Sequence, residues 1–575
     1  MLVLHHVAKC EWCYSLGMYL RTISRHNKDG SVVRYLQLAH NHWDPLGHQA
    51  KAQVIHSFGR EDQLDREALK RLARSLTRLL EPQEALAATT SEDLAFVESR
   101  PLGGALVLDH LWHQLGIDQG LRRLLAGRKL DPRVERVLFA LVANRALEPL
   151  SKLAGTQWVR ERVFIPGLAE VDEDSCYRAM DFLLECEEEL AKAIYFSTAE
   201  LLDLNVDLIF FDGSSTYWET DQEDSDQVDE DGEVVKLGFR SYGHSKDHRA
   251  DLPQVLIGMA VTREGIPIRV WSCPGNTGES PLLRQVRDDL QGWQLGRVVW
   301  VADRGFSSQA NRDYLQQDGE NYIIGEKLRG GSKKAAWALS WPGLYHQVAE
   351  NLQVKEVVLE DDRFVICYNP EQAVRDQAVR ERLLKRLEAE LADSDQLSIE
   401  KRSELLGKLR TKPGLGRLLR VTKDGLLRVD RAAVEREAHL DGKYLARSSD
   451  PTMTADEIAL GYKQLLQVER GWRDMKTTLD LRPVYHRKEE RIRAHIVVCW
   501  LALLLIRVAE NRTQDTWRNL RHELQRLHLG AFQGSAGRCL QRTEITSRQA
   551  EILKSLEIPE PSRFLTLEAN TRPAA

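Results

Sequence analysis

The chain has 575 residues, too many for one ordinary hydrophobic core, so two to four domains are expected. Its 42% apolar and 29% charged content suits a soluble protein with buried cores. The formal net charge of −6 excludes binding of a polyanion by bulk charge. Both ends are nevertheless basic: residues 1–80 hold 12 Lys/Arg against 7 Asp/Glu, and residues 461–548 hold 17 against 9. Contact with nucleic acid would give this pattern, and so would ordinary fluctuation.

Cysteine usage and hydropathy indicate a cytoplasmic protein. The eight Cys are mostly scattered, several of them inside apolar runs, which is typical of reduced thiols. Cys10 and Cys13 have the spacing of a zinc knuckle, but no second pair follows them. No signal peptide is visible. The longest apolar run, residues 496–506, is too short to span a bilayer and predicts a buried helix.

The N-terminal part predicts a small basic module made of a hairpin and a helix. From Met18 onward, two β-like runs flank the turn signal Asn27–Gly30, and a third run covers Ala52–Phe58. Glu61–Leu80 has apolar residues at helical spacing and carries several Arg and Lys. Residues 1–17 fit poorly with this pattern, so Met18 is the expected natural start.

A helical region follows a linker over residues 81–92. Apolar residues recur at three- and four-residue intervals through residues 101–202, which predicts helices around an ordinary core. Chemistry-bearing motifs are not evident in this stretch.

At Asp207 the spacing of apolar residues changes from the helical period to runs that are typical of strands. Asp207–Tyr217, Gln254–Thr262, Pro267–Cys273, Arg297–Ala302 and Asn321–Gly325 read as strands, with helices over Ser280–Trp293 and Ser307–Gln317. This order predicts an α/β fold with a mixed sheet. The acidic run from Glu219 to Glu233 reads as a solvated, mobile loop; a metal-binding loop is the alternative.

Two acids stand out on these strands. Asp212 lies inside the apolar run of the first strand, and Asp303 follows the apolar run RVVWVA. Burial of a carboxylate is costly unless it is paired or binds a metal, and converging carboxylates suit Mg²⁺ or Mn²⁺. Capping of a turn by Asp212 and of a helix by Asp303 explains each acid separately.

A third acid lies in a predicted helix over Thr454–Leu479. Tyr462 precedes Glu469 by seven residues and Lys476 follows it by seven, so the three share one face of a helix, with Arg473 close to it. An acid flanked by a hydroxyl and cations suits contact with a metal and a phosphate backbone, and it also suits a surface helix with ion pairs. A second helix is expected over Arg491–Glu510, and Pro559–Ala575 is expected to be loose.

With these acids in view, the chain resembles the insertion-sequence transposases of the DDE class that carry a Tyr-x2-Arg-x3-Glu-x6-Lys signature. Tyr462, Glu469 and Lys476 match that signature at its spacing, whereas Leu465 stands at the arginine position. Other similar stretches are MYLRTISRHNKDGSVVRYLQLAHN, GHSKDHRADLPQVLIGMAV, GIPIRVWSCPGNT, VADRGF and LRPVYHRKEERIRAHI. The resemblance covers nearly the whole chain from Met18. Lys246, Asp247 and His248 also match a family motif, and a turn between strands explains them equally well.

The resemblance implies a ribonuclease-H-like core and a DNA transposase that uses two divalent ions, Mg²⁺ or Mn²⁺. Asp212, Asp303 and Glu469 would be the catalytic metal ligands, and Tyr462, Arg473 and Lys476 would contact DNA phosphates. The expected partners are the terminal inverted repeats and target DNA, with a homodimer in the synaptic complex. No membrane partner is expected, because the longest apolar run is too short to span a bilayer. ATP is not expected either, because a P-loop is absent.

Two other functions remain open: a catalytically inactive DNA-binding relic, and a metal-dependent nuclease on the same fold. The expected organisation is an over-called extension (1–17), a hairpin-plus-helix DNA-binding module (18–90), a helical domain (91–205), the first part of the core (206–328), an inserted domain with a charged helical hairpin (329–455), the core helices with the third acid (456–510) and a basic C-terminal region (511–575).

Overall fold

The computed structural model describes residues 18–27, 31–44, 49–80, 94–202, 207–220, 222–293, 295, 297–360, 362–482, 486–534 and 537–569. The chain divides into two compact units. The first comprises Met1–Glu98, Ala531–Gln541 and Phe564–Ala575, and the second comprises Ser99–Gly530 and Arg542–Arg563. The expected extension 1–17, the linker 81–92 and the Cys10–Cys13 pair lie outside the described residues.

The N-terminal part is a three-stranded antiparallel sheet followed by a helix. β1 (Met18–His26), β2 (Val32–Asp44) and β3 (Gln49–Arg60) lie in that order, and Met18 pairs with His40. The short 3₁₀ helix η1 (Glu61–Gln63) and α1 (Arg66–Leu80) follow. The hairpin, the third strand and the helix predicted from the sequence are therefore confirmed.

The C-terminal residues form a sheet that the sequence pattern did not predict. Its strands lie in the order β20 (Phe564–Ala569), β19 (Gly537–Arg542), β18 (His528–Gly534) and β4 (Leu94–Pro101). Arg538 pairs with Glu568 in the antiparallel β19–β20 ladder. The expectation of a loose segment over Pro559–Ala575 was wrong for residues 564–569, because this ladder satisfies their backbone groups.

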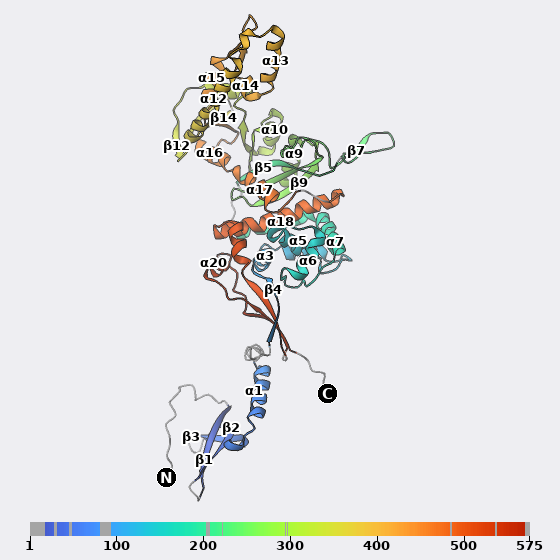
Figure 1. Cartoon of the computed structure of the whole chain (residues 1–575), viewed down its shortest axis with the longest axis vertical. Coiled ribbons are helices and arrows are strands. Elements are labelled where there is room, and N and C mark those ends of the chain that lie inside the picture. The colour runs from blue at the N-terminus through green and yellow to red at the C-terminus, as the bar shows by residue number, and fades with distance from the viewer. Residues whose placement is uncertain are drawn as a thin grey trace. The chain divides into compact units, whose positions relative to one another are not determined.

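A helical layer surrounds the long helix α18 (Glu489–Thr513). Figure 1 shows α18 between α17 on one side and α5 and α7 on the other. α18 is apolar and long enough to cross a membrane by composition, but 94% of its most apolar window is buried inside the protein, so packing accounts for that composition. The other helices of this region are α3 (Gly103–Gln114), α4 (Ile117–Leu125), α5 (Val134–Leu147), α6 (Lys152–Glu161), α7 (Glu173–Glu185), α8 (Glu187–Leu202), α19 (Trp517–Leu524) and α20 (Ser547–Ser555).

A nine-stranded mixed sheet packs on the other side of α18. Its order is β12 (His346–Ala349), β13 (Leu352–Leu359), β14 (Asp362–Tyr368), β17 (Lys443–Ser448), β11 (Asn321–Glu326), β10 (Val299–Ala302), β5 (Leu208–Tyr217), β8 (Gln254–Val261) and β9 (Pro267–Pro274). β10 runs parallel to β5 and β11, whereas the other neighbours are antiparallel. The predicted α/β class with a mixed sheet is confirmed.

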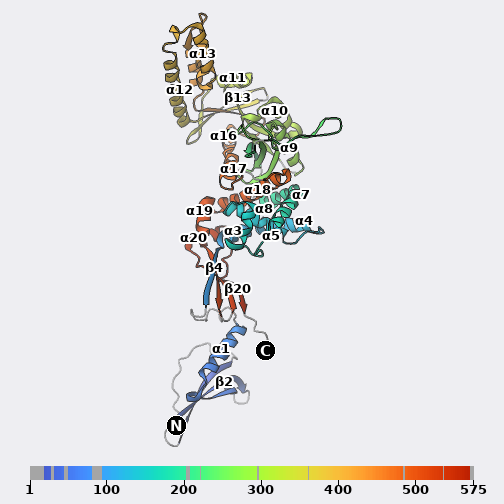
Figure 2. The same cartoon turned by 45° about the vertical axis from the view of Figure 1, so that its right-hand side comes forward.

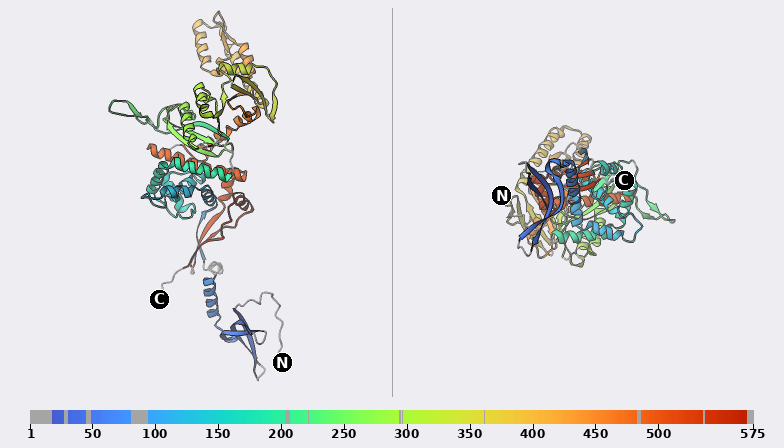
Figure 3. Two further views of the ribbon diagram at one scale, coloured as in Figure 1. Left: turned by 180° about the vertical axis from the view of Figure 1, so that it is seen from behind. Right: turned by 90° about the horizontal axis from the view of Figure 1, so that it is seen from below.

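Helices and short turns accompany this sheet. They are α9 (Glu279–Gln291), η2 (Arg304–Phe306), α10 (Gln309–Leu315), η3 (Gln317–Gly319), α11 (Lys333–Ser340), α16 (Ala455–Lys463) and α17 (Leu466–Thr477). The described residues of the acidic run 219–233 are mostly exposed, as expected of a solvated loop. Within it β6 (Gln227–Val228) pairs with β7 (Val234–Lys236), which follows the run, and this two-stranded hairpin projects from the sheet (Figure 3).

The expected inserted domain is divided between the sheet and an arm. Strands β12, β13, β14 and β17 extend the core sheet, because β17 pairs with both β11 and β14. The remaining residues form the arm, with α12 (Pro370–Leu391), η4 (Ser394–Gln396), α13 (Ile399–Arg410), α14 (Pro413–Gly416), β15 (Leu419–Val421), β16 (Leu427–Val429) and α15 (Arg431–Ala438). Figure 2 shows α12 and α13 side by side in it, as the charged helical hairpin predicts. The arm has a small core of its own, formed by Leu387, Leu409, Leu415 and Leu418.

Candidate active site

Asp212 and Asp303 lie at equivalent positions of adjacent parallel strands. Phe211 of β5 pairs with Ala302 of β10, and each acid is the next residue along its strand. Asp303 ends its strand and caps η2, where its Oδ1 accepts a hydrogen bond from Gly305 N at 2.6 Å. Parallel pairing therefore brings the two carboxylates together, although 90 residues of sequence separate them.

The surroundings of Asp212 oppose its negative charge. Burial, together with the nearby charge of Asp303, raises the pKa of Asp212 to about 6. The ammonium of Lys246 acts in the opposite direction, with its Nζ 3.5 Å from Asp212 Oδ1 and 2.5 Å from the carbonyl oxygen of Gly213. Asp212 is thus a half-buried acid with one cation as its neighbour.

Glu279 is a further acid at this place that the sequence did not reveal. It is the first residue of α9, and its Oε1 lies 2.8 Å from Lys246 Nζ. A Cβ added at Gly305 would lie 2.7 Å from Glu279 Oε2 and 2.9 Å from Asp303 Oδ1, so both carboxylates converge on this glycine. An acid in the first turn of a helix is common because it interacts favourably with the helix dipole, so Glu279 carried no sequence signal of this contact.

The predicted helix over Thr454–Leu479 is two helices, α16 and α17. The chain passes between them through a tight turn at Gln464 and Leu465, where Leu465 N donates to the carbonyl of Tyr462. Leu465, at the position of the family arginine, is only 7% exposed and packs in the core. A single straight helix was therefore a wrong prediction, because the backbone forms 3₁₀-type bonds on both sides of the buried leucine.

Tyr462 is close to two of the acids. Burial and the charges of Asp303 and Glu469 raise the pKa of its hydroxyl. The hydroxyl packs against Gly325 of β11, where any Cβ would collide with it. Glu469 itself is exposed on α17. Within the described residues no three His, Cys, Asp or Glu side chains already lie in an arrangement that could hold a metal ion.

Lys476 is engaged by a carboxylate. Its Nζ lies 2.8 Å from Asp247 Oδ1, and Arg482 pairs with the other oxygen of Asp247. Burial lowers the pKa of Lys476 and outweighs the effect of Asp247. Arg473, in contrast, is exposed on α17. Of the three residues expected to contact DNA, Tyr462 and Lys476 thus have protein contacts that hold them in place.

The stretch of Lys246, Asp247 and His248 supplies one cation and one anion to this site. Lys246 contacts the acids on β5 and α9, Asp247 contacts the cations that follow Glu469, and His248 has the left-handed φ of +58°. The turn expected from the sequence is present, and its side chains connect the strands to α17.

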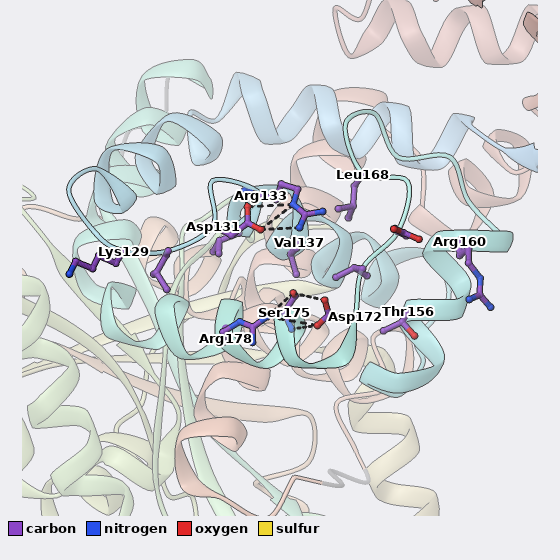
Figure 4. Close-up of a pocket in the computed structure, with 14 residues that line it drawn as sticks. Lys129, Asp131, Arg133, Val137, Thr156, Arg160, Leu168, Asp172, Ser175 and Arg178 are labelled. Atoms are coloured by element: carbon purple, nitrogen blue, oxygen red, sulfur yellow. Dashed lines mark hydrogen bonds and ion pairs between the residues drawn. The ribbon is translucent and has the colours of Figure 1, made fainter. Parts of the chain in front are cut away.

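A cavity of about 450 Å³ lies elsewhere, among α5, α6 and α7 (Figure 4). Charged side chains line it, but they pair with neighbours: Arg133 with Asp131, and Arg178 with Ser175. This cavity contains none of the acids described above.

Comparison with known proteins gives two family matches. Residues 207–505 match the transposase DDE domain, and residues 20–88 match the N-terminal domain of IS1634 family transposases. No curated protein matches the chain. Among solved structures, the chain is similar to a piggyBac transposase in a synaptic complex with hairpin DNA. The identity is 10%, over 75% of this chain and 82% of that chain, with a TM-score of 0.33.

Proposed function

The chain belongs to the DDE transposases, and we propose that it cleaves DNA at the terminal inverted repeats of its insertion sequence and joins the 3′ ends to target DNA. The observation that carries the proposal is the adjacency of Asp212 and Asp303 on β5 and β10, inside the matched residues. DNA transposition is the activity that the family implies. The specific DNA ends and the joining step are our proposal.

We propose Asp212, Asp303 and Glu469 as the acids of the catalytic site. DDE transposases generally use divalent metal ions, and the residues present fit such a group: the donors are hard carboxylate oxygens, and a cation, Lys246, already lies against Asp212. When bound by these acids, Mg²⁺ or Mn²⁺ would activate the attacking water or 3′-hydroxyl and stabilise charge on the leaving oxygen.

The remaining residues would orient the DNA. Arg473 is exposed on the same helix as Glu469, so its guanidinium can reach a phosphate near the scissile bond. The hydroxyl of Tyr462 lies near Asp303 and Glu469, where it can donate a hydrogen bond to a phosphate oxygen. Lys476, held by Asp247, adds positive charge beside them.

We also propose that the N-terminal module grips the element ends, with its helix α1 carrying Arg66, Lys70, Arg71, Arg74 and Arg78. Since two ends must be brought together, the working form would be a homodimer. The expected place of action is the bacterial cytoplasm.

The test is an in vitro reaction of the purified full chain with Mg²⁺ and DNA that carries the terminal repeats found beside its gene. Asp212→Ala, Asp303→Ala and Glu469→Ala should each reduce cleavage by at least about 10³-fold, because removal of a metal ligand disables the chemical step. Binding to the end DNA, measured by gel shift, should stay nearly intact. The control Asp313→Asn changes an exposed acid on α10 and should cleave normally.

The DNA products of this reaction distinguish a transposase from a nuclease and from an inactive relic. Joined 3′ ends identify a transposase, whereas cleavage without joining identifies a nuclease, and binding without cleavage identifies a relic. Near-normal cleavage by any one of the three alanine variants would remove that residue from the site.

A further inference from the structure

We propose that Glu279 is a positioning residue of this site: it binds the ammonium of Lys246 and so leaves Asp212 available to a divalent cation. The proposal rests on the proposed function, in which Asp212 and Asp303 hold Mg²⁺ or Mn²⁺. It adds a fourth acid, with a role distinct from that of the other three.

The distances from the Lys246 ammonium show which acid lies closest to it. Lys246 Nζ is 2.8 Å from Glu279 Oε1 and 3.5 Å from Asp212 Oδ1, so Glu279 is the closer carboxylate and Asp212 accepts only a long, weaker bond. The remaining short contact of the ammonium is the carbonyl oxygen of Gly213, at 2.5 Å. Glu279 and a backbone carbonyl therefore take the two short contacts of the ammonium, and Asp212 has the longest of the three.

Lys246 is also fixed beside the strand. Its backbone N donates to Ser215 Oγ of β5 at 2.9 Å, and its side chain is only 28% exposed. Burial lowers the pKa of Lys246, but the charges of Asp212 and Glu279 outweigh it and keep the ammonium protonated. Without Glu279, the acids left to this tethered cation are Asp212 and Asp303, the proposed metal ligands.

Glu279 is held in place by close packing. Its Oε2 lies 2.7 Å from the position that a Cβ of residue 305 would take, so the close approach depends on glycine at residue 305. Asp303 Oδ1 lies 2.9 Å from the same position, so the two carboxylates approach one point beside this glycine. Glu279 is thus part of the built site rather than a surface acid that happens to be near.

Direct binding of the divalent metal ion by Glu279 is the competing explanation. A double-mutant cycle with Lys246 separates this explanation from the positioning role. If Glu279 acts through Lys246, its substitution matters only while the Lys246 charge is present. If Glu279 is itself a ligand, its substitution weakens cation binding in either background.

The experiment measures Mn²⁺ binding to the full chain without DNA, by electron paramagnetic resonance of free Mn²⁺. Glu279→Gln should weaken binding by about tenfold, because Lys246 then pairs with Asp212. Lys246→Met should bind Mn²⁺ at least as tightly as the unaltered chain. Lys246→Met/Glu279→Gln should bind within about twofold of Lys246→Met alone. Asp288→Asn, an exposed acid on the same helix α9, should leave the affinity unchanged.

Either of two results overturns the proposal: unchanged affinity in Glu279→Gln, or an equal loss in the Lys246→Met background. Thermal unfolding of each variant verifies that it folds. Failure of the proposed function is a separate result, because Asp212→Asn and Asp303→Asn would then also leave Mn²⁺ affinity unchanged.

Discussion

The contact between Asp247 and Lys476 explains how single residues join the strands to the helix that carries Glu469. Asp247 accepts from Lys476 and from Arg482, and all three side chains are at least half-buried. Burial raises the pKa of Asp247, but the bonds from Arg482 and Lys476 outweigh it and hold the pKa below its usual value. One carboxylate thus pairs with two cations, Lys476 within α17 and Arg482 after its end.

Asp247→Asn should lower the free energy of unfolding by about 3 kcal/mol, since it leaves two cations partly buried without their anion. The folded state of the unaltered chain gains this stabilisation only above the usual pKa of an aspartate, about 3.9, and loses it as the pH falls further. Thermal or urea unfolding at pH 7 measures the effect. Asp251→Asn, an exposed acid of the same loop, is the matched control, and an equal loss there would contradict the argument.

At the scale of elements, the turn between α16 and α17 determines where Glu469 points. The residue at the turn, Leu465, packs in the core beside Val468, whereas Leu466 next to it is 59% exposed. The family signature places an arginine where this chain buries a leucine. The guanidinium of such an arginine would have to leave the core before it could reach a phosphate.

Leu465→Arg should therefore destabilise the chain by more than about 3 kcal/mol and should not improve DNA cleavage. Leu466→Arg places the same charge on an exposed position and should change stability by less than about 0.5 kcal/mol. Urea unfolding of the two variants, measured side by side, tests this difference. A stable Leu465→Arg variant with faster cleavage would show that the signature arginine is accommodated after all.

In the second unit as a whole, the sheet and the arm have separate hydrophobic cores. β14 and β17 are direct neighbours, and Asn369 N donates to the carbonyl of Gly442 at the point where the arm leaves the sheet. The arm has its own core of leucines, whereas β13, β14 and β17 contribute Val354, Val365 and Ala446 to the main core. The arm is therefore inserted at the end of an intact hairpin.

Replacement of residues 370–441 by an Asn-Gly turn should leave the sheet folded, because a two-residue loop of this kind connects antiparallel strands. We expect the main unfolding transition within about 5 °C of that of the full chain. Calorimetry measures the transition, and hydrogen exchange reports on the amides of β14 and β17. Loss of protection in these strands would show that the arm is needed to fold the sheet.

The mixed α/β class, the strands that lead to Asp212 and Asp303, and the buried character of α18 could all be predicted from the sequence. These features follow from hydrophobic period and turn chemistry, which act over a few residues. Which distant groups meet became visible in the folded structure. It brought Glu279 to Lys246, tied Lys476 to Asp247, extended the core sheet through β17 and paired β20 with β19. Such contacts depend on register and packing between segments tens to hundreds of residues apart, which no local pattern encodes.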